Sequence, residues 1–347
     1  METLKKITFC LFILLLIPAY TLKAQYTTTK IKTINEAYRD SLKQVEYKYT
    51  FPILGQGAYK KGFDIPYPAG IMGNYMWMKQ NIVLDNLQLG LKTDNVDIPL
   101  TDVSFIQFGD NTNTSYSLNV RPDLWIFPFL NVYGIFGYGE SNTAVNIVAP
   151  IELVSAVDQS LTTAGFGVMG AGGIGPVWFS VDANWTWSKP ALLDKAVLVN
   201  VLGIRIGHTF KFKNKPQSNI ALWAGTMRVN MNSETSGEIK LIDALPPETW
   251  ERRDEIVNNY YDWYNNEATP VQKIAADKVL TPLVERIENA DGESIVRYGM
   301  EKQVKEKWNG TIGGQYQINK RWMFRTEAGF IGNRKSFLLS VNYRFLI

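Results

Sequence analysis

The stretch Ser336–Ile347, SFLLSVNYRFLI, decides the fold of this chain. Apolar and aromatic side chains occupy one parity of the stretch, and mostly polar side chains occupy the other. The first parity holds Phe337, Leu339, Val341, Tyr343, Phe345 and Ile347, and the second holds Ser336, Ser340, Asn342 and Arg344, with Leu338 and Leu346 as exceptions. Because successive side chains of a strand point to opposite faces, the stretch predicts a β-strand with one apolar face and one mostly polar face.

The run before it, 321–331, alternates in the same way, and residues 332–335 form a turn between the two. Its apolar face holds Trp322, Phe324 and Phe330, and its polar face holds Arg321, Arg325 and Glu327. Working outward, similar stretches predict twelve strands in all. Their approximate bounds are 69–79, 82–92, 98–108, 115–126, 131–141, 163–174, 176–188, 198–213, 217–231, 307–318, 321–332 and 334–347.

The first 24 residues have the layout of a secretory signal peptide. Lys5 and Lys6 begin it, an apolar core spans 7–17, and small or polar residues lead to a cleavage point after Ala24. The apolar run is shorter than the ~20 residues that a transmembrane helix needs. Cys10 is the only cysteine and lies in this core, so the sequence predicts no disulfide or thiol chemistry in the mature chain.

The composition differs from that of a helical membrane protein. After residue 24 there is no long uncharged apolar run, the mean hydropathy is −0.13, and aromatic residues make up 13% of the chain. Transmembrane β-barrels have this profile because only every second residue of a strand meets lipid. A secreted soluble β-protein is the alternative. The formal net charge is only +3, so no nucleic-acid partner is expected.

The signal peptide, the amphipathic strands and the aromatic final strand together resemble Gram-negative outer-membrane β-barrel (porin-like) proteins. The resemblance covers about 69–347 apart from one insert, although the chain continues two residues beyond Phe345. It implies an all-β fold, a transmembrane antiparallel β-barrel of about twelve strands in the cell outer membrane. The implied partners are outer-membrane lipid, lipopolysaccharide and the barrel assembly machinery. No functional residues can be carried over from the class.

Loop lengths support an even strand number. In bacterial barrels the periplasmic turns are short and the outer loops are long. Counted back from the C-terminus, the predicted periplasmic connections are 319–320, 214–216, 174–175, 127–130 and 93–97, and the outer ones include 109–114, 142–162, 189–197 and 232–306. Ten or fourteen strands remain alternatives, because 142–162 could extend a strand or supply another hairpin.

Two segments lie outside the strand pattern. Residues 25–68 are predicted to form an N-terminal segment that is periplasmic or enters the lumen. Residues 233–305 are predicted to form a helical extracellular insertion that could contact a small solute or a surface partner. One helix face holds Trp250, Val257, Tyr260, Tyr261 and Tyr264. A second helix begins at Thr269-Pro270 with Gln272 as a capping-box partner, and a third is predicted within 293–306.

Inward-facing charges are the candidate site. Nine charged residues on the clearer strands are predicted to line a pore: Arg121, Asp123, Asp182, Arg205, Lys211, Arg321, Arg325, Glu327 and Arg344. Six are basic and three are acidic, and a basic lumen would favour anions. The alternative is a salt-bridge lattice that fills a narrow barrel. The sequence does not decide between the two.

Other motifs predict no catalytic chemistry. His208 is the only histidine and shares the parity of Ile206 and Phe210, so it should face lipid rather than form an active site. With no second histidine and no mature cysteine, a zinc site is not expected. The glycine-rich run 165–173 lacks the strand–helix context of a dinucleotide loop. We therefore expect no cofactor and no enzyme activity.

Three functions remain open at this stage. The favoured one is a passive channel or transporter for small solutes, anions among them. The alternative is a structural or surface-interaction barrel whose insert binds a partner. An outer-membrane lipid enzyme is the least favoured.

Overall fold

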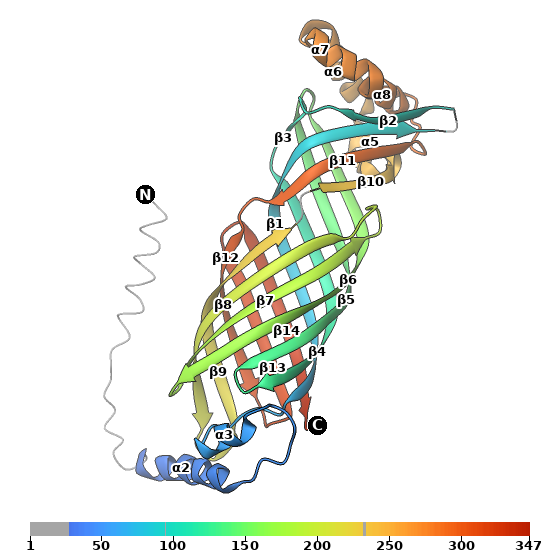
Figure 1. The fold of residues 1–347 in the computed structure, drawn as a ribbon. Helices are drawn as coiled ribbons and strands as arrows, with labels where there is room; N and C mark the ends of the chain where they lie inside the picture. The colour runs from blue at the N-terminus through green and yellow to red at the C-terminus, as the bar shows by residue number, and fades with distance from the viewer. Residues whose placement is uncertain (1–27, 94, 232–233) are drawn as a thin grey trace.

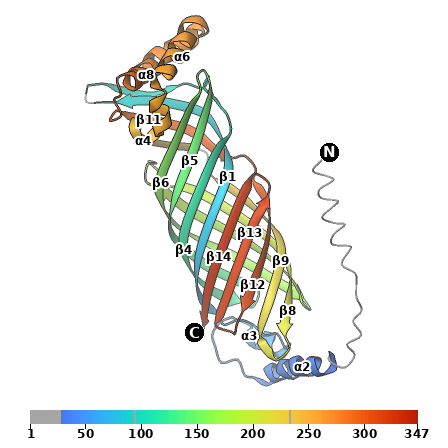
Figure 2. The same cartoon turned by 180° about the vertical axis from the view of Figure 1, so that it is seen from behind.

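The computed structural model describes residues 28–93, 95–231 and 234–347, and the predicted signal peptide lies outside them. Ten of the described strands close into an antiparallel barrel (Figures 1 and 2). In order around the barrel they are β1 (Ala69–Lys92), β4 (Asn111–Phe127), β5 (Leu130–Ala149), β6 (Leu153–Ile174), β7 (Val177–Pro190), β8 (Val197–Phe212), β9 (Lys215–Met231), β12 (Trp308–Gln317), β13 (Trp322–Ile331) and β14 (Arg334–Phe345). Because β1 pairs with both β4 and β14, the sheet is closed, and the predicted antiparallel barrel is confirmed.

Four further strands lie outside the closed barrel. They are β2 (Asp97–Asp102), β3 (Gln107–Phe108), β10 (Glu234–Lys240) and β11 (Ile295–Val304). β11 pairs with residues 82–92 of β1 and with β10, so it extends the sheet beyond one end of the barrel. We call this the insert end. The opposite end, where Ala69 pairs with Phe345, is the terminal end.

The strand number is therefore ten and not the predicted twelve. The predicted strands 69–79 and 82–92 are one strand of 24 residues, β1. Gln80, at the predicted break, faces the lumen, where its Oε1 accepts a hydrogen bond from Arg334 Nε at 3.0 Å. The predicted strand 98–108 is instead the short pair β2 and β3. Its apolar residues Val103 and Ile106 are buried in a core at the insert end, so they do not alternate against lipid.

Two predicted connections also differ. Residues 93–97 were predicted on the side of the short periplasmic turns, but they lie at the insert end, because β1 and β4 each span the barrel once. The predicted outer loop 142–162 is mostly strand. There β5 continues to Ala149 and β6 begins at Leu153. Residues 130–147 of β5 pair without interruption with residues 153–170 of β6.

The insert carries the helices α4 (Leu241–Ala244), α5 (Pro247–Glu251), α6 (Arg253–Asn266), α7 (Pro270–Ala275) and α8 (Thr281–Glu288), with a π-helical turn η1 (Ala276–Leu280) between the last two. The predicted capping box at Thr269 and Gln272 is confirmed. The prediction of a helix within 293–306 is wrong, because this segment is β11. Among the described residues, no helix is long and apolar enough to cross a membrane.

These helices pack with β2, β3, β10 and β11 around one apolar core (Figure 1). We call this unit, residues 97–108 and 234–304, the cap. Its most buried side chains include Tyr260, Val279 and Val103, and Leu91 of β1 joins them. The predicted face of α6 is buried at Val257 and Tyr260, and Ile256 and Trp263 are also buried on that helix.

The outside of the barrel is apolar. Exposed side chains include Val177, Phe179 and Val181 on β7, and the predicted outward parity of β14 is exposed as well. Aromatic residues mark both edges: Trp77 pairs with Phe337 towards the insert end, and the rings of Trp322 and Tyr343 are in tilted contact, 4.8 Å between centroids, at the terminal end. A closed barrel satisfies its backbone hydrogen bonds in lipid, and an apolar band with aromatic girdles fits it to the membrane. The chain is an outer-membrane β-barrel.

The N-terminal segment lies across the terminal end (Figures 1 and 2). It contains α2 (Thr28–Gln44) and α3 (Gly55–Lys60). Asp64 holds it in place, because this carboxylate accepts from the Tyr38 hydroxyl at 3.1 Å and pairs with Lys320 in the β12–β13 turn at 2.8 Å. The Arg344 side chain also donates to the backbone oxygens of Tyr67 and Pro68.

Candidate functional site

A lattice of ion pairs crosses the lumen towards the terminal end. Arg205 on β8 donates two hydrogen bonds to Glu327 on β13, at 2.7 and 3.0 Å, although β9 and β12 separate these strands around the wall. Arg205 also pairs with Asp182 on β7. Arg325 and the Trp223 indole complete the coordination of Glu327, at 2.9 and 2.8 Å. Paired and hydrogen-bonded in this way, the buried charges compensate one another.

Two further groups extend this lattice, and we call the whole set of these lumenal charged residues the floor. Arg344 on β14 donates to Asp123 on β4 at 2.9 Å, and Asn131 donates to the same oxygen at 2.8 Å. The Arg121 guanidinium lies 3.4 Å from the centre of the Tyr133 ring, a cation–π contact. Small residues make room for these side chains to lie across the wall: a Cβ at Gly203 would stand 2.7 Å from an Asp182 carboxylate oxygen.

The nine predicted pore-lining residues fall into two groups. Seven lie in the lumen and belong to the floor: Arg121, Asp123, Asp182, Arg205, Arg325, Glu327 and Arg344. Lys211 and Arg321 are exposed at the terminal rim. Six of these seven lumenal charges, all but Arg121, pair directly with an opposite charge, so the predicted basic excess is mostly neutralised. Their role in lining a conducting pore stays a prediction.

A cavity of about 610 Å³ lies between this floor and the cap. Its size is that of a small-molecule site, which spans roughly 300–1,000 Å³. Arg205, Arg325 and Glu327 border it on the floor side, and Tyr260, Leu283 and Ile287 of the cap helices border it at the insert end. The wall between is mainly aliphatic and contains Met72, Met76, Met78, Leu161, Val199, Val201, Met227, Val229 and Met231.

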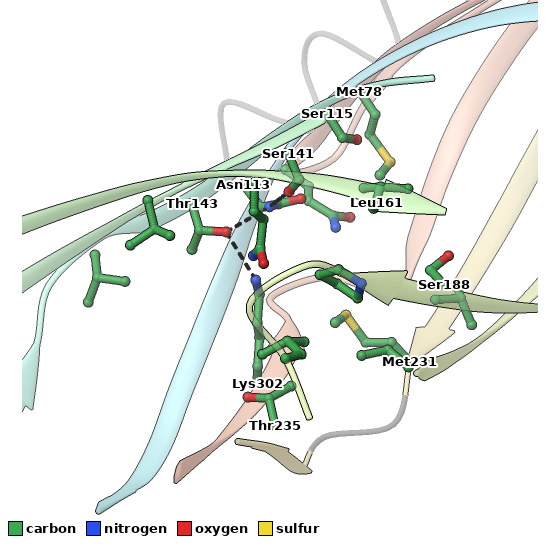
Figure 3. A pocket seen from close by; sticks show the side chains of 18 of the residues that line it. Met78, Asn113, Ser115, Ser141, Thr143, Leu161, Ser188, Met231, Thr235 and Lys302 are labelled. Atoms are coloured by element: carbon green, nitrogen blue, oxygen red, sulfur yellow. Dashed lines mark hydrogen bonds between the residues drawn. The ribbon is translucent and has the colours of Figure 1, made fainter. Parts of the chain in front are cut away.

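Polar side chains interrupt this wall at several places, among them Asn74, Thr163 and Ser188. Figure 3 shows the polar patch around Lys302 from close by. The Lys302 amine of β11 points towards β5 and donates to Thr143 Oγ1 at 3.2 Å. Asn113 of β4 donates to the same oxygen at 2.9 Å and to Ser141 Oγ at 2.8 Å. The patch therefore joins one amine, one amide and two hydroxyls at the edge of an apolar space.

Burial sets the chemistry of this amine. Lys302 lies on the part of β11 that extends beyond the aromatic edge of the membrane band, opposite Leu84 of β1. Desolvation lowers its pKa to about 8, because removing water penalises the charged form. Its partly accessible surface faces the cavity. A buried cation that faces a cavity is a typical feature of a binding or catalytic site.

This patch is not among the site residues predicted from the sequence. Lys302 lay in a predicted helix, so its parity was not considered. The signal was present nonetheless, since Val296, Tyr298, Met300 and Lys302 alternate as a strand requires, and all four border the cavity. Thr143 was assigned to an outer loop, whereas it faces the lumen from β5.

His208 lies where its parity predicted. Its ring centroid is 4.4 Å from that of Phe210, on the outer face of β8. Within 28–93, 95–231 and 234–347, no group of three or more His, Cys, Asp or Glu side chains is arranged to hold a metal ion. The expectation of a non-enzymatic barrel stays a prediction.

Comparisons with known proteins give only distant barrels. No protein-family model matches this chain, and the search of curated proteins found no match. The β domain of the Bordetella autotransporter BrkA is similar at 7% identity, over 80% of this chain and 100% of that one, with a TM-score of 0.37. The translocator domain of the autotransporter NalP from Neisseria meningitidis has 10% identity, coverages of 94% and 100%, and a TM-score of 0.33. The Ralstonia pickettii toluene transporter TbuX has 7% identity, coverages of 81% and 90%, and a TM-score of 0.29. At these values none of them assigns a function or a site residue.

Proposed function

We propose that this outer-membrane barrel binds a small apolar or amphipathic solute in its lumen and transports it, and that it is not an open ion-conducting pore. The observation that carries the proposal is the cavity of about 610 Å³ with its mainly aliphatic wall. Lipid and headgroup contacts do not require apolar side chains on the inside of a barrel. An apolar lumen next to a polar floor instead fits a ligand that leaves water to bind.

The floor argues against a wide aqueous path. Arg205 and Glu327 join non-adjacent strands across the lumen, and Trp223 and Arg325 fill the space around them. An open anion channel would need unpaired positive charge along its wall. Here the charges nearest the centre are engaged with one another, which favours the lattice over the anion-selective channel.

The proposal includes an orientation. We place the cap outside the cell and the terminal end in the periplasm, since bacterial barrels keep their short turns and both termini on the periplasmic side. The turns at the terminal end connect β4 to β5, β6 to β7 and β8 to β9 with few residues. Protease added to intact cells should then cleave the cap, and protection of the cap with cleavage only after lysis would contradict this orientation.

Binding is tested with a matched pair of substitutions. Val199 borders the cavity, whereas Val181 on β7 faces lipid. Val199→Trp should place a large side chain in the cavity and weaken binding of the neutral fluorescent probe N-phenyl-1-naphthylamine to protein held in amphipol. Val181→Trp should bind the probe normally. Equal binding by both variants, or a large steady conductance of the wild-type protein in planar bilayers, would contradict the proposed function.

A second function is favoured by one observation on the cap. Val271 and Ile274, three residues apart on α7, are 76% and 60% exposed, and such apolar pairs on a protruding helix are typical of contact surfaces. This is the interaction barrel of the sequence analysis. If it is the function, the double substitution Val271→Ser and Ile274→Ser should abolish partner capture and leave probe binding unchanged.

A further inference from the structure

We propose that Lys302, Thr143 and Ser141 form an anchor for a carboxylate, and that the ligand of the cavity is an amphipathic monoanion with an apolar tail. This inference rests on the proposed function, because it names the class of solute that the same cavity binds. The carboxylate would meet the Lys302 amine, and the tail would lie along the aliphatic wall.

The first argument is the unused charge of Lys302. A lysine amine has three donors, and among the described residues its only hydrogen-bond partner is Thr143 Oγ1. Burial lowers its pKa with no contribution from any carboxylate. By contrast, the buried cation Arg205 in the floor has two carboxylate partners. Lys302 lacks such a partner within the described chain, and an incoming anion would supply it.

The second argument is the direction of the neighbouring hydroxyls. Thr143 Oγ1 accepts hydrogen bonds from both Lys302 and Asn113, and Ser141 Oγ accepts from Asn113. A hydroxyl that accepts in this way keeps its own proton to donate elsewhere. Asn113 thus orients both hydroxyls as donors, and together with the amine they offer hydrogen bonds to the two oxygens of one carboxylate.

The third argument is the surface that surrounds the patch. Met78, Leu161 and Met231 lie near it in Figure 3 and border the same cavity, as do the hydroxyl-bearing Ser115, Ser188 and Thr235. Methionine side chains are flexible and adapt to ligands of different shape. A fully polar ligand would leave this wall in contact with polar groups, and a fully apolar one would leave the Lys302 charge buried without a partner. A carboxylate on an apolar tail satisfies both.

The test uses the full mature chain in amphipol, with protein-free amphipol as the blank. Dodecanoate and dodecan-1-ol have tails of equal length, and each competes against bound N-phenyl-1-naphthylamine. The wild-type protein should prefer dodecanoate. Lys302→Met should weaken dodecanoate binding at least about tenfold, the change expected for the loss of a charged hydrogen bond, and leave the alcohol and the probe unchanged. Lys302→Arg should retain the preference.

A matched control is available near the end of the same strand. Lys305 is exposed and pairs with Asp110 at 3.0 Å, so Lys305→Met removes the same charge outside the cavity and should not affect either competitor. If the wild-type protein binds probe and alcohol but does not prefer the carboxylate, the anchor is wrong and the proposed function stands. If the probe itself does not bind, the proposed function fails. Dodecyl phosphate binding more tightly than dodecanoate would also overturn the carboxylate assignment.

Discussion

The barrel and the cap bury opposite kinds of side chain. In the barrel, the charged Arg205 and Glu327 lie inside, and the apolar Val181 and Phe179 face outward. In the cap, the apolar Tyr260 and Val279 lie inside, and charged side chains such as Arg253 face outward. The same chain therefore contains two cores of opposite polarity. The difference follows from the solvent around each region, because lipid accepts apolar side chains that water rejects. The cavity lies where the two meet, with a charged floor and an apolar cap.

The largest expected effect comes from removing one arginine of the floor. Arg205→Met leaves Asp182 and Glu327 buried without their shared partner, and breaking such a group costs about 3–5 kcal/mol in the free energy of unfolding. Urea titration in lipid vesicles, followed by tryptophan fluorescence, measures it. Arg297 of the cap is the control, since it also bridges two carboxylates, Asp97 and Glu238, but is partly exposed to water. Arg297→Met should cost at most about 1 kcal/mol, and equal costs would contradict the buried lattice.

A substitution in the apolar core should act on the cap instead. Leu91 is 0% exposed in that core, and Leu→Ala at such a site costs about 2–5 kcal/mol. Leu91→Ala should raise the hydrogen-exchange rate of α6 and α8 while the barrel keeps its resistance to urea. Leu339→Ala, on the lipid face of β14, is the control and should leave the cap unchanged. Faster exchange throughout the barrel would show that the two cores are not separate.

Arginine substitutions at two exposed valines test whether lipid surrounds the barrel and water surrounds the cap. Val181 is 44% exposed on the barrel and Val271 is 76% exposed on α7. Val181→Arg should destabilise the barrel by about 2–4 kcal/mol if the site lies near the bilayer midplane. Val271→Arg should change stability by no more than about 0.5 kcal/mol, the usual range for surface sites. Tolerance of arginine at residue 181 in vesicle-based unfolding would place β7 in water.

The smallest expected effect is a pH dependence of dodecanoate binding at Lys302, where the barrel and the cap meet. With a pKa of about 8, Lys302 is mostly protonated at pH 7, and the protonated amine is the form that binds an anion. A bound carboxylate would raise that pKa, so affinity for dodecanoate should fall about tenfold, or about 1.4 kcal/mol, between pH 7 and pH 9.5. Lys302→Arg should remove this dependence, because arginine does not titrate there.

The surrounding groups permit this assignment. The side chains at the amine, Asn113, Ser141 and Thr143, carry no charge and do not titrate in this range. Burial raises the pKa values of Tyr260 and Tyr298 to about 12, so these cap tyrosines stay neutral at pH 9.5. The remaining titratable side chains around the cavity are Tyr116 and the floor residues Arg121, Asp182, Arg205, Arg325 and Glu327. A pH dependence that persists in Lys302→Arg would point to one of these instead.

Sequence reasoning succeeded where the environment on each face was uniform. β7 and β14 alternate between lipid and a polar floor, so parity alone placed Val181, Asp182 and Arg344 correctly. It failed where a strand passes from one environment to another. β1 faces lipid in its first half and the cap core in its second, so its pattern changes near Gln80 and suggested two strands. Lys302 was missed for the same reason, since β11 lines a cavity that only the completed fold creates.

Strand β1 also ties the assembly of the two regions together. Its first half forms the seam with β14 that closes the barrel, and its second half pairs with β11. Both seams join distant parts of the chain, and such non-local contacts are slow to form. Until β1 is paired, the barrel and the cap sheet both have an open edge, which is prone to pairing with another chain. Because one strand takes part in both seams, we expect barrel closure and completion of the cap to be coupled, so that a change which weakens the β1–β11 seam should also slow barrel assembly.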